Sequence, residues 1–292
     1  MTRDDIILSI RTLSRIHNNK PITDDAIKII IERAIDDFSN KCPFCIAIDR
    51  GNSAKGQQEY LTCKDYLEII EVHYMDSPGV LLNASISDTD MLLTTAAPID
   101  DFPNSGQLNI AGEIMNYSSK DDITRTFTIS ARGVSNTPAM PHSAGCGIIQ
   151  ANQKFARLEP TSNRRLGDED GAYISAQPGT PTRYYFFPGI IGFDVPISKT
   201  GYHNILIRSF VRPPALVSDA SVITGMITTY NSAVVNYGVA KVLQMLSQDD
   251  ATASMGRSYW ADYISNVNEF KKTKHLYVRG DNPQVIPYTG RL

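Results

Sequence analysis

Apolar residues recur at helical spacing in two segments near the start of the chain. The first, residues 4–17, places isoleucine and leucine three or four positions apart and ends before Pro21. The second begins at Thr23, which predicts an N-cap followed by two acidic residues in the first turn, and its apolar stripe runs to Phe38. We therefore expect an αα-hairpin, which needs another part of the chain to cover its apolar face.

The pattern changes between Pro78 and about Ile149, where short apolar segments alternate with turn residues and predict β-strands. The clearest is 124–131, in which apolar residues alternate with Thr and Ser. A separate strand is expected around 67–74, and a hairpin over 193–210 with its turn at 199–201. Two polar stretches with Gly or Pro are expected to be loops, 40–58 and 152–182, and the second contains a charge run at 164–170.

Helical spacing returns in the last third of the chain. Ser218 is predicted to cap a long helix that reaches Leu246, and a final helix over 255–272 repeats aromatic residues on one side. The segment 276–292 contains Pro283 and Pro287 and is expected to be an extended tail.

These elements predict an α+β fold of about two domains. The N- and C-terminal helix pairs would form one discontinuous α-helical bundle that is interrupted by a small inserted β domain. The expected domains are a helical domain with a β hairpin, the inserted β domain, and the tail, with boundaries 1–76 plus 152–275, 77–151 and 276–292, respectively.

Composition narrows the function classes. The chain of 292 residues has 28 basic and 31 acidic side chains, a net charge of −3, which argues against a broad basic face for binding duplex DNA. The longest uncharged helical run, 220–240, is too polar for the centre of a bilayer. No secretory signal opens the chain, and four cysteines fit a reducing cytosol.

Cys42-Pro-Phe-Cys45 is the one spacing that suggests catalysis or metal binding. A redox pair of this kind needs a strand before it and a helix after it, whereas here a predicted helix precedes and an apolar extended segment follows. A zinc site would need two further paired ligands, and Cys63 and Cys146 are single and distant. The five histidines are scattered, and no phosphate-binding loop is present. We expect no enzymatic activity, no metal and no cofactor.

Residues 105–145 carry a recognisable motif: a strand with Gly112-Glu113 and Tyr117, a Thr-rich strand, and then Arg132-Gly133, Asn136, Ala139, His142 and Gly145. The pattern resembles a small β module found in neck and tail proteins of tailed bacteriophages. Asn136 stands where the module has Gly, and Asn tolerates positive φ. In this interpretation the glycines supply turn dihedrals, and Arg132 binds carbonyls or pairs with Glu113 across the sheet. The alternative role is binding of a glycan or receptor.

A second segment, 212–219, leads into the aromatic C-terminal helices. Together with the N-terminal helical hairpin it is similar to head-to-tail adaptor (connector) proteins of tailed bacteriophages. The resemblance implies a homo-oligomeric ring, of twelve copies, beneath the portal protein. It also implies contacts with the portal and with tail or other neck proteins, and packaged DNA that passes through the lumen without sequence-specific binding. The protein would lie in the virion neck, and in the host cytoplasm during assembly.

The C-terminal segment is the candidate partner contact. An isolated tail of this length cannot bury enough surface to offset its ordering entropy, so we expect a partner surface, that of the portal, to order it. The candidate residues are basic or apolar: Lys271, Lys272, Lys274, Tyr277, Val278, Arg279, Val285, Ile286 and Tyr288.

Two alternatives remain open from the sequence. One is a peripheral tail or baseplate protein whose β module binds a partner or host glycan. The other is a redox or zinc protein built around Cys42 and Cys45.

Overall fold

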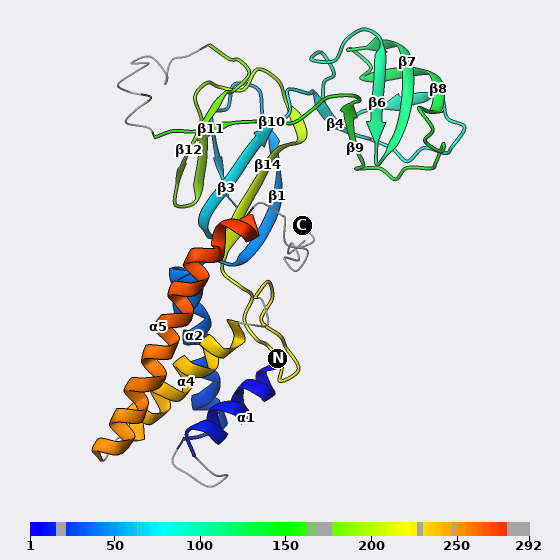
Figure 1. The fold of residues 1–292 in the computed structure, drawn as a ribbon. Coiled ribbons are helices and arrows are strands. Elements are labelled where there is room, and N and C mark those ends of the chain that lie inside the picture. Colours follow the sequence, from blue (N-terminus) through cyan, green and yellow to red (C-terminus); the bar gives the residue numbers. More distant parts are fainter. Residues whose placement is uncertain are drawn as a thin grey trace. The chain divides into compact units, whose positions relative to one another are not determined.

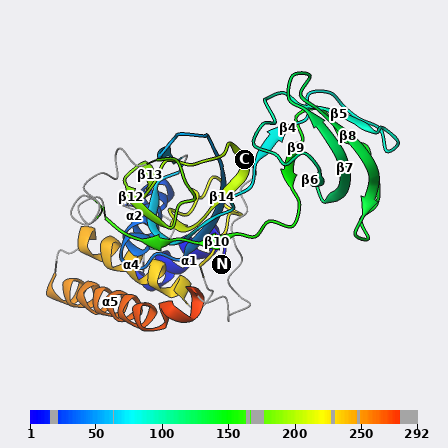
Figure 2. The same cartoon turned by 90° about the horizontal axis from the view of Figure 1, so that it is seen from above.

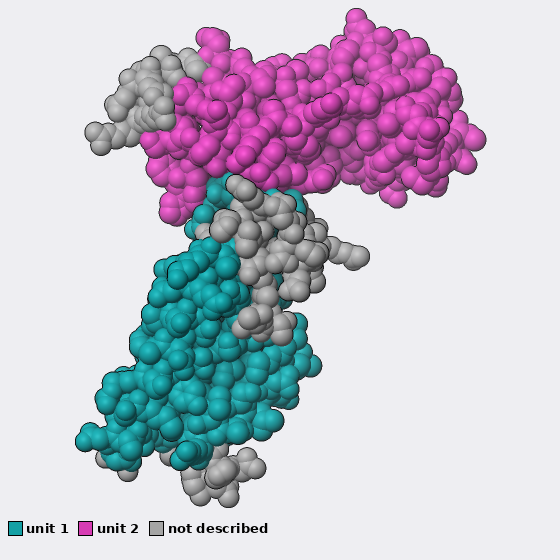
Figure 3. Space-filling view, in the orientation of Figure 1, with its two compact units in different colours: residues 1–48, 64–70, 208–292 teal, residues 49–63, 71–207 magenta. Residues whose placement is uncertain are grey.

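The structure is a computed structural model that describes residues 1–15, 22–62, 64–162, 166, 177–226, 230–246 and 249–278. Within these ranges the chain is mostly β, with fourteen strands in three sheets and four helices (Figure 1). The predicted fold class, an α-helical bundle with a small inserted β domain, is therefore wrong. The chain divides into two compact units, unit 1 with residues 1–48, 64–70 and 208–292 and unit 2 with residues 49–63 and 71–207 (Figure 3).

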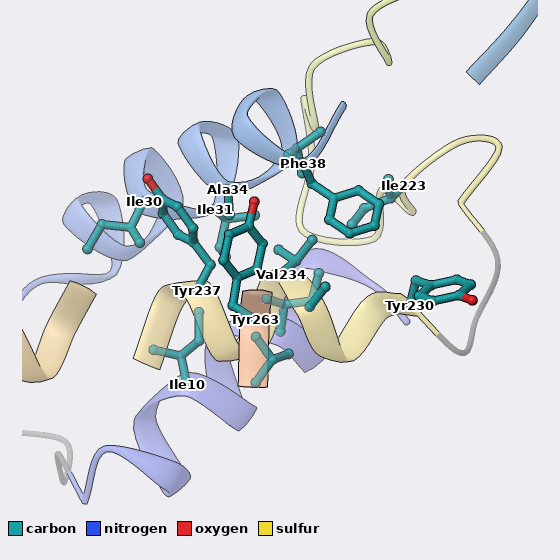
Figure 4. Packing of buried hydrophobic residues seen from close by; sticks show 14 of the residues in the cluster. Ile10, Ile30, Ile31, Ala34, Phe38, Ile223, Tyr230, Val234, Tyr237 and Tyr263 are labelled. Carbon is teal, nitrogen blue, oxygen red and sulfur yellow. The ribbon is translucent and has the colours of Figure 1, made fainter. Parts of the chain in front are cut away.

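Unit 1 contains the helices, whose apolar faces share one core. They are α1 (Arg3–Leu13), α2 (Asp24–Lys41), α4 (Asn231–Leu246) and α5 (Asp250–Val278). Thr23 caps α2 as predicted, with its hydroxyl accepting from the Ala26 amide at 3.3 Å. Phe38 of α2 contacts the rings of Tyr263 and Phe270 from α5 at centroid distances of 6.5 and 5.6 Å. Figure 4 shows Val234 of α4 in the same core.

Helix α4 shares this core with α2, but the helix predicted from Ser218 to Leu246 is too long. Helix α4 begins at Asn231 rather than near Ser218. Val222 instead forms an isolated β-bridge with Thr2, and Gly225 has φ +76°, a conformation that a helix cannot contain. Ile223 still reaches the core from this irregular segment.

Helix α5 is longer than predicted at both ends. It runs from Asp250 to Val278, so the start of the expected extended tail is helical. The rest of the tail, 279–292, lies outside the described residues, as does most of the charge run 164–170.

Two four-stranded sheets contain segments that the sequence predicts to be loops. The first has the order β1-β14-β3-β10, formed by Cys45–Ser53, Gly201–Val211, Tyr66–Tyr74 and Ala156–Arg157. The second has the order β11-β12-β13-β2, formed by Glu159–Pro160, Arg183–Phe187, Ile190–Phe193 and Glu59–Leu61. The strand predicted at 67–74 is confirmed as β3. The hairpin predicted over 193–210 is wrong, because β13 pairs with β12 and β2 while β14 belongs to the other sheet.

The strands predicted between 78 and 149 are confirmed in a six-stranded antiparallel sheet within unit 2. Its order is β4-β9-β6-β7-β8-β5, with Gly79–Leu81, Gly147–Gln150, Gly106–Ile110, Glu113–Asp121, Thr126–Val134 and Leu92–Thr94. Figure 2 shows β7 and β8 as long, curved strands, and their pairing contains three register shifts. We call residues 79–150 the β module; they enclose their own apolar cluster around Leu108, Met115 and Phe127.

Candidate functional site

The most concentrated polar chemistry in the described residues lies inside the β module, around Glu113. This carboxylate begins β7, directly after a turn in which Ala111 and Gly112 have φ of +48° and +98°. Its side chain is completely buried. The neighbouring strand β8 supplies Arg132, and the loop after β8 supplies His142, whose side chain is also buried. We call these three side chains the Glu113 network.

Five donors surround the two carboxylate oxygens of Glu113. Arg132 binds both oxygens, from Nε to Oε1 at 3.0 Å and from Nη2 to Oε2 at 2.8 Å. The amides of Gly133 and Met140 donate at 3.2 and 3.0 Å. His142 Nε2 lies 2.8 Å from Oε2. Since an ionised carboxylate only accepts, His142 carries its proton on Nε2 in this contact.

The guanidinium of Arg132 also connects the network to nearby loops. Its Nη1 donates to the carbonyl of Ser87 and, at 3.4 Å, to that of Asp90, and its Nη2 donates to the carbonyl of Met140 at 2.7 Å. The backbone of His142 forms a β-bridge with Ile86. The network therefore connects the loop with Ser87 and Asp90 and the loop with Met140 and His142 to β8.

The turns around the network have the dihedrals that the motif predicts. Asn136 has φ +62° and Gly145 has φ +84°. Gly133 has φ +60°, and a Cβ there would lie 2.9 Å from both the Ala139 amide nitrogen and the Thr137 carbonyl oxygen. A glycine at 133 thus lets the chain turn tightly enough for its amide to reach Glu113.

The environment makes Glu113 a poor base. Burial alone would raise the pKa of Glu113, but the hydrogen bonds from Arg132, Met140 and His142 outweigh it and lower the pKa to about 2. A general base needs a pKa near the working pH and access to a substrate proton, and Glu113 has neither. The arrangement therefore suits a structural clamp rather than acid–base chemistry.

The sequence predicts the contact of Arg132 with Glu113 in this network but not the contribution of His142. The sequence predicts that Arg132 pairs with Glu113 or binds carbonyls, and the structure contains both kinds of contact. The sequence groups His142 with the other scattered histidines, whereas in the structure its side chain is only 3% exposed and hydrogen-bonded to Glu113. Its fixed place in the motif was the signal that could have identified it.

Those predicted partner-contact residues that the structure describes belong to unit 1, at the end of α5. Lys271 and Lys272 are exposed on that helix. Lys274, Tyr277 and Val278 belong to its last turns. The remaining predicted contacts lie outside the described residues: Arg279, Val285, Ile286 and Tyr288.

Cys42 and Cys45 end one element and begin the next, as the sequence predicts. Cys42 is the C-cap residue of α2, Cys45 opens β1, and both are buried free thiols. Cys42 Sγ donates to the Val267 carbonyl oxygen at 3.4 Å. Burial raises the pKa of Cys45 to about 11, against a smaller opposing effect of Lys64. A reactive cysteine needs the opposite shift, so this geometry disfavours the redox interpretation.

We expect Cys45 to resist alkylation in the folded protein. At pH 8 a thiol with a pKa near 11 is almost entirely protonated, and protonated thiols are poor nucleophiles. Iodoacetamide labelling read out by peptide mass spectrometry should modify Cys45 at least tenfold more slowly in buffer than in 8 M urea. Equal rates in both conditions would contradict the buried placement.

A cavity of about 650 Å³ also lies in unit 2, and Ala111 and Gly112 of the β6–β7 turn are among the residues that line it. Tyr202 and His203 line it with rings stacked at a centroid distance of 4.0 Å, and Arg50, Asn109 and Phe155 contribute further walls. Burial, followed by the charge of Arg50, lowers the pKa of His203, which favours the neutral ring. The volume of this cavity is within the range of small-ligand binding sites.

Among the described residues, no cluster of three or more His, Cys, Asp or Glu side chains is placed to hold a metal ion. None of the helices in that part of the chain has an apolar stretch long enough to cross a membrane. No family model matches the sequence, and no curated protein matches it significantly.

Proposed function

We propose that the protein is a structural subunit of a ring in the neck of a tailed bacteriophage. The ring, of twelve copies, would join the portal to the tail and let DNA pass through its lumen. The observation that carries the proposal is a contact between two segments that both contribute to the adaptor resemblance. The first segment is the hairpin of α1 and α2, and the second is residues 212–219, about 200 positions later in the chain.

These segments are joined by specific polar contacts within unit 1. The Arg3 guanidinium donates to the Leu216 carbonyl and to Asp219, with Nε 3.1 Å from Oδ1. The Leu216 amide donates to the Glu32 carboxylate at 3.1 Å, and the Arg3 amide to the Ser221 carbonyl at 2.9 Å. The two segments that resemble adaptor proteins therefore contact each other in the folded unit 1.

The Glu113 network supports the same proposal from the other unit. Its charged residues bind one another and the module's own backbone, so the motif needs no substrate or metal to explain it. A mildly acidic protein also suits a conduit, because a lumen coated with Lys and Arg would retain DNA.

The proposal predicts that the full-length chain binds the portal protein encoded in the same genome. Because Lys271 and Lys272 are exposed on α5, reversing both to Glu should weaken portal binding at least fivefold, and more at low salt. Biolayer interferometry with immobilised portal measures this effect. Reversal of Lys154, an exposed cation of unit 2, is the matched control and should leave binding unchanged. Absence of any portal binding by the unmodified chain would contradict the proposal.

The cavity at Tyr202 and His203 favours a second candidate, a peripheral tail or baseplate protein that binds a glycan. Stacked rings flanked by Arg50 and Asn109 offer an apolar platform and polar groups to a small ligand. A protein of this kind would bind a host glycan without assembling into a portal-associated ring.

A further inference from the structure

Unit 1 carries a cationic groove between α4 and α5. The groove has a volume of about 590 Å³, and small residues form its floor. Gly256 of α5 lies so close to α4 that a Cβ there would be 3.4 Å from Leu243 Cβ. Lys241 and Gln244 of α4 form one rim, and Arg257 and Trp260 of α5 form the other. We call this surface the α4/α5 groove.

The cations of the α4/α5 groove have no acidic partner among the described residues. Lys241 Nζ lies 5.0 Å from the centre of the Trp260 ring and 5.7 Å from that of Tyr237, which fixes it at the rim. Lys241 Nζ also donates to the side-chain oxygen of the neutral Gln244 amide at 3.4 Å. Arg257 is exposed, and the Trp260 side chain is 36% exposed. The groove thus offers two positive charges beside an aromatic surface.

Helix α1 offers the complementary chemistry on its outer face. Asp4, Leu8 and Thr12 are exposed at four-residue spacing, while the opposite face buries Ile6 and Ile10. Leu8 is 67% exposed and supplies an apolar side chain to this face. Asp5, beside Asp4, adds a second exposed carboxylate, of which Oδ2 accepts from the Thr2 amide at 2.8 Å in the capping box. We call Asp4, Asp5, Leu8 and Thr12 the α1 face.

The α1 face and the α4/α5 groove lie on different sides of α4. Ile10 of α1 packs on Gly238 of α4, where a Cβ would lie 2.4 Å from Ile10 Cδ1. Helix α5 packs on α4 at Gly256, as described above. Figures 1 and 2 both draw α4 between α1 and α5. One copy of unit 1 therefore cannot bring its own α1 face into its own groove.

We infer that the α1 face of one copy docks in the α4/α5 groove of the next copy. This inference rests on the proposed ring and names its subunit contact. Two carboxylates and one leucine meet two cations and one tryptophan, so charge and apolar surface are both matched. Pairing of groove with groove would oppose like charges, which disfavours a symmetric dimer. A contact between two different faces is heterologous and generates a ring when the rotation closes.

Charge reversal tests the contact on the full-length chain. The groove variant carries Lys241→Glu and Arg257→Glu, and the α1 variant carries Asp4→Lys and Thr12→Lys. Each alone should form less than a tenth of the rings that the unmodified protein forms under the same conditions, as measured by mass photometry. Arg33→Glu, an exposed reversal on α2, is the control and should assemble normally. Circular dichroism should report unchanged folding for all variants.

Mixing the two variants provides the decisive readout. Every reversed groove then finds a reversed α1 face, so the mixture should form rings of alternating copies, which close when the copy number is even. Rings from either variant alone, or no rings from the mixture, would overturn this contact while leaving the proposed ring intact. If the unmodified chain fails to assemble even with the portal, the proposed function itself is contradicted.

Discussion

Glu113→Gln is expected to destabilise the β module by at least about 3 kcal/mol. The substitution keeps the shape of the side chain but leaves the Arg132 guanidinium, only 5% exposed, without its counter-charge. Removing one partner of a buried ion pair typically costs about 3–5 kcal/mol for this reason. Hydrogen exchange of the β7 and β8 amides, followed by mass spectrometry, measures the loss locally.

Two controls accompany this substitution. Asp88→Asn removes an exposed carboxylate from the same module and should change the protection of β7 and β8 by less than about 0.5 kcal/mol. Trp260, the single tryptophan of the chain, reports on unit 1 by its fluorescence. Equal protection in Glu113→Gln and the unmodified chain would contradict the structural role of the network.

The same carboxylate predicts an acid-dependent stability. Its pKa in the folded protein, about 2, lies below the ordinary value of 4.5, so its stabilising contribution is complete above about pH 4.5. The contribution is lost as the pH falls from about 4.5 towards 2, and it amounts to about 3 kcal/mol. The β7 and β8 amides of the unmodified protein should therefore lose protection over this range more steeply than those of Glu113→Gln. Parallel pH profiles would show that Glu113 is not the responsible group.

Val234→Asp is expected to cost unit 1 at least about 3 kcal/mol. Val234 is fully buried in the core where α1, α2, α4 and α5 meet, and an aspartate there has no cation to pair with. Urea unfolding monitored by Trp260 fluorescence gives the free energy of unfolding of unit 1. If the variant is insoluble, Val234→Ala should show a loss of about 2 kcal/mol by the same measurement.

Ser258→Asp provides the matched surface control for this experiment. Ser258 is exposed on α5, so the same added charge should shift the free energy of unfolding by less than about 0.5 kcal/mol. Similar effects of Val234→Asp and Ser258→Asp would mean that α4 does not form the centre of the core.

The helices and the β module were predictable from sequence because their signals are local. A cap at Thr23 and a long apolar stripe identify α2, and strict alternation around Phe127 identifies β8. The fold class was not predictable in the same way. Strand β1 begins with three consecutive buried residues, Cys45 to Ala47, so it lacks alternation, and several other strands have only two or three residues.

Long-range pairing explains the remaining errors. The assignment of β13 and β14 to different sheets depends on partners distant in sequence, which a local pattern cannot reveal. The irregular segment 218–226 has helical spacing, but its β-bridge from Val222 to Thr2 joins residues 220 positions apart. In the candidate site, Glu113 and Arg132 lie on adjacent strands, so their pairing could be predicted from the sequence. His142 reaches them from a loop whose path only the structure defines.

Mass photometry of the full-length protein, alone and mixed with its portal, tests the central proposal most directly. We expect a closed assembly with a mass twelve times that of the 32.3 kDa chain, either free or bound to the portal. A protein that stays at 32.3 kDa, or forms only small oligomers in the presence of portal, would contradict the neck-ring function.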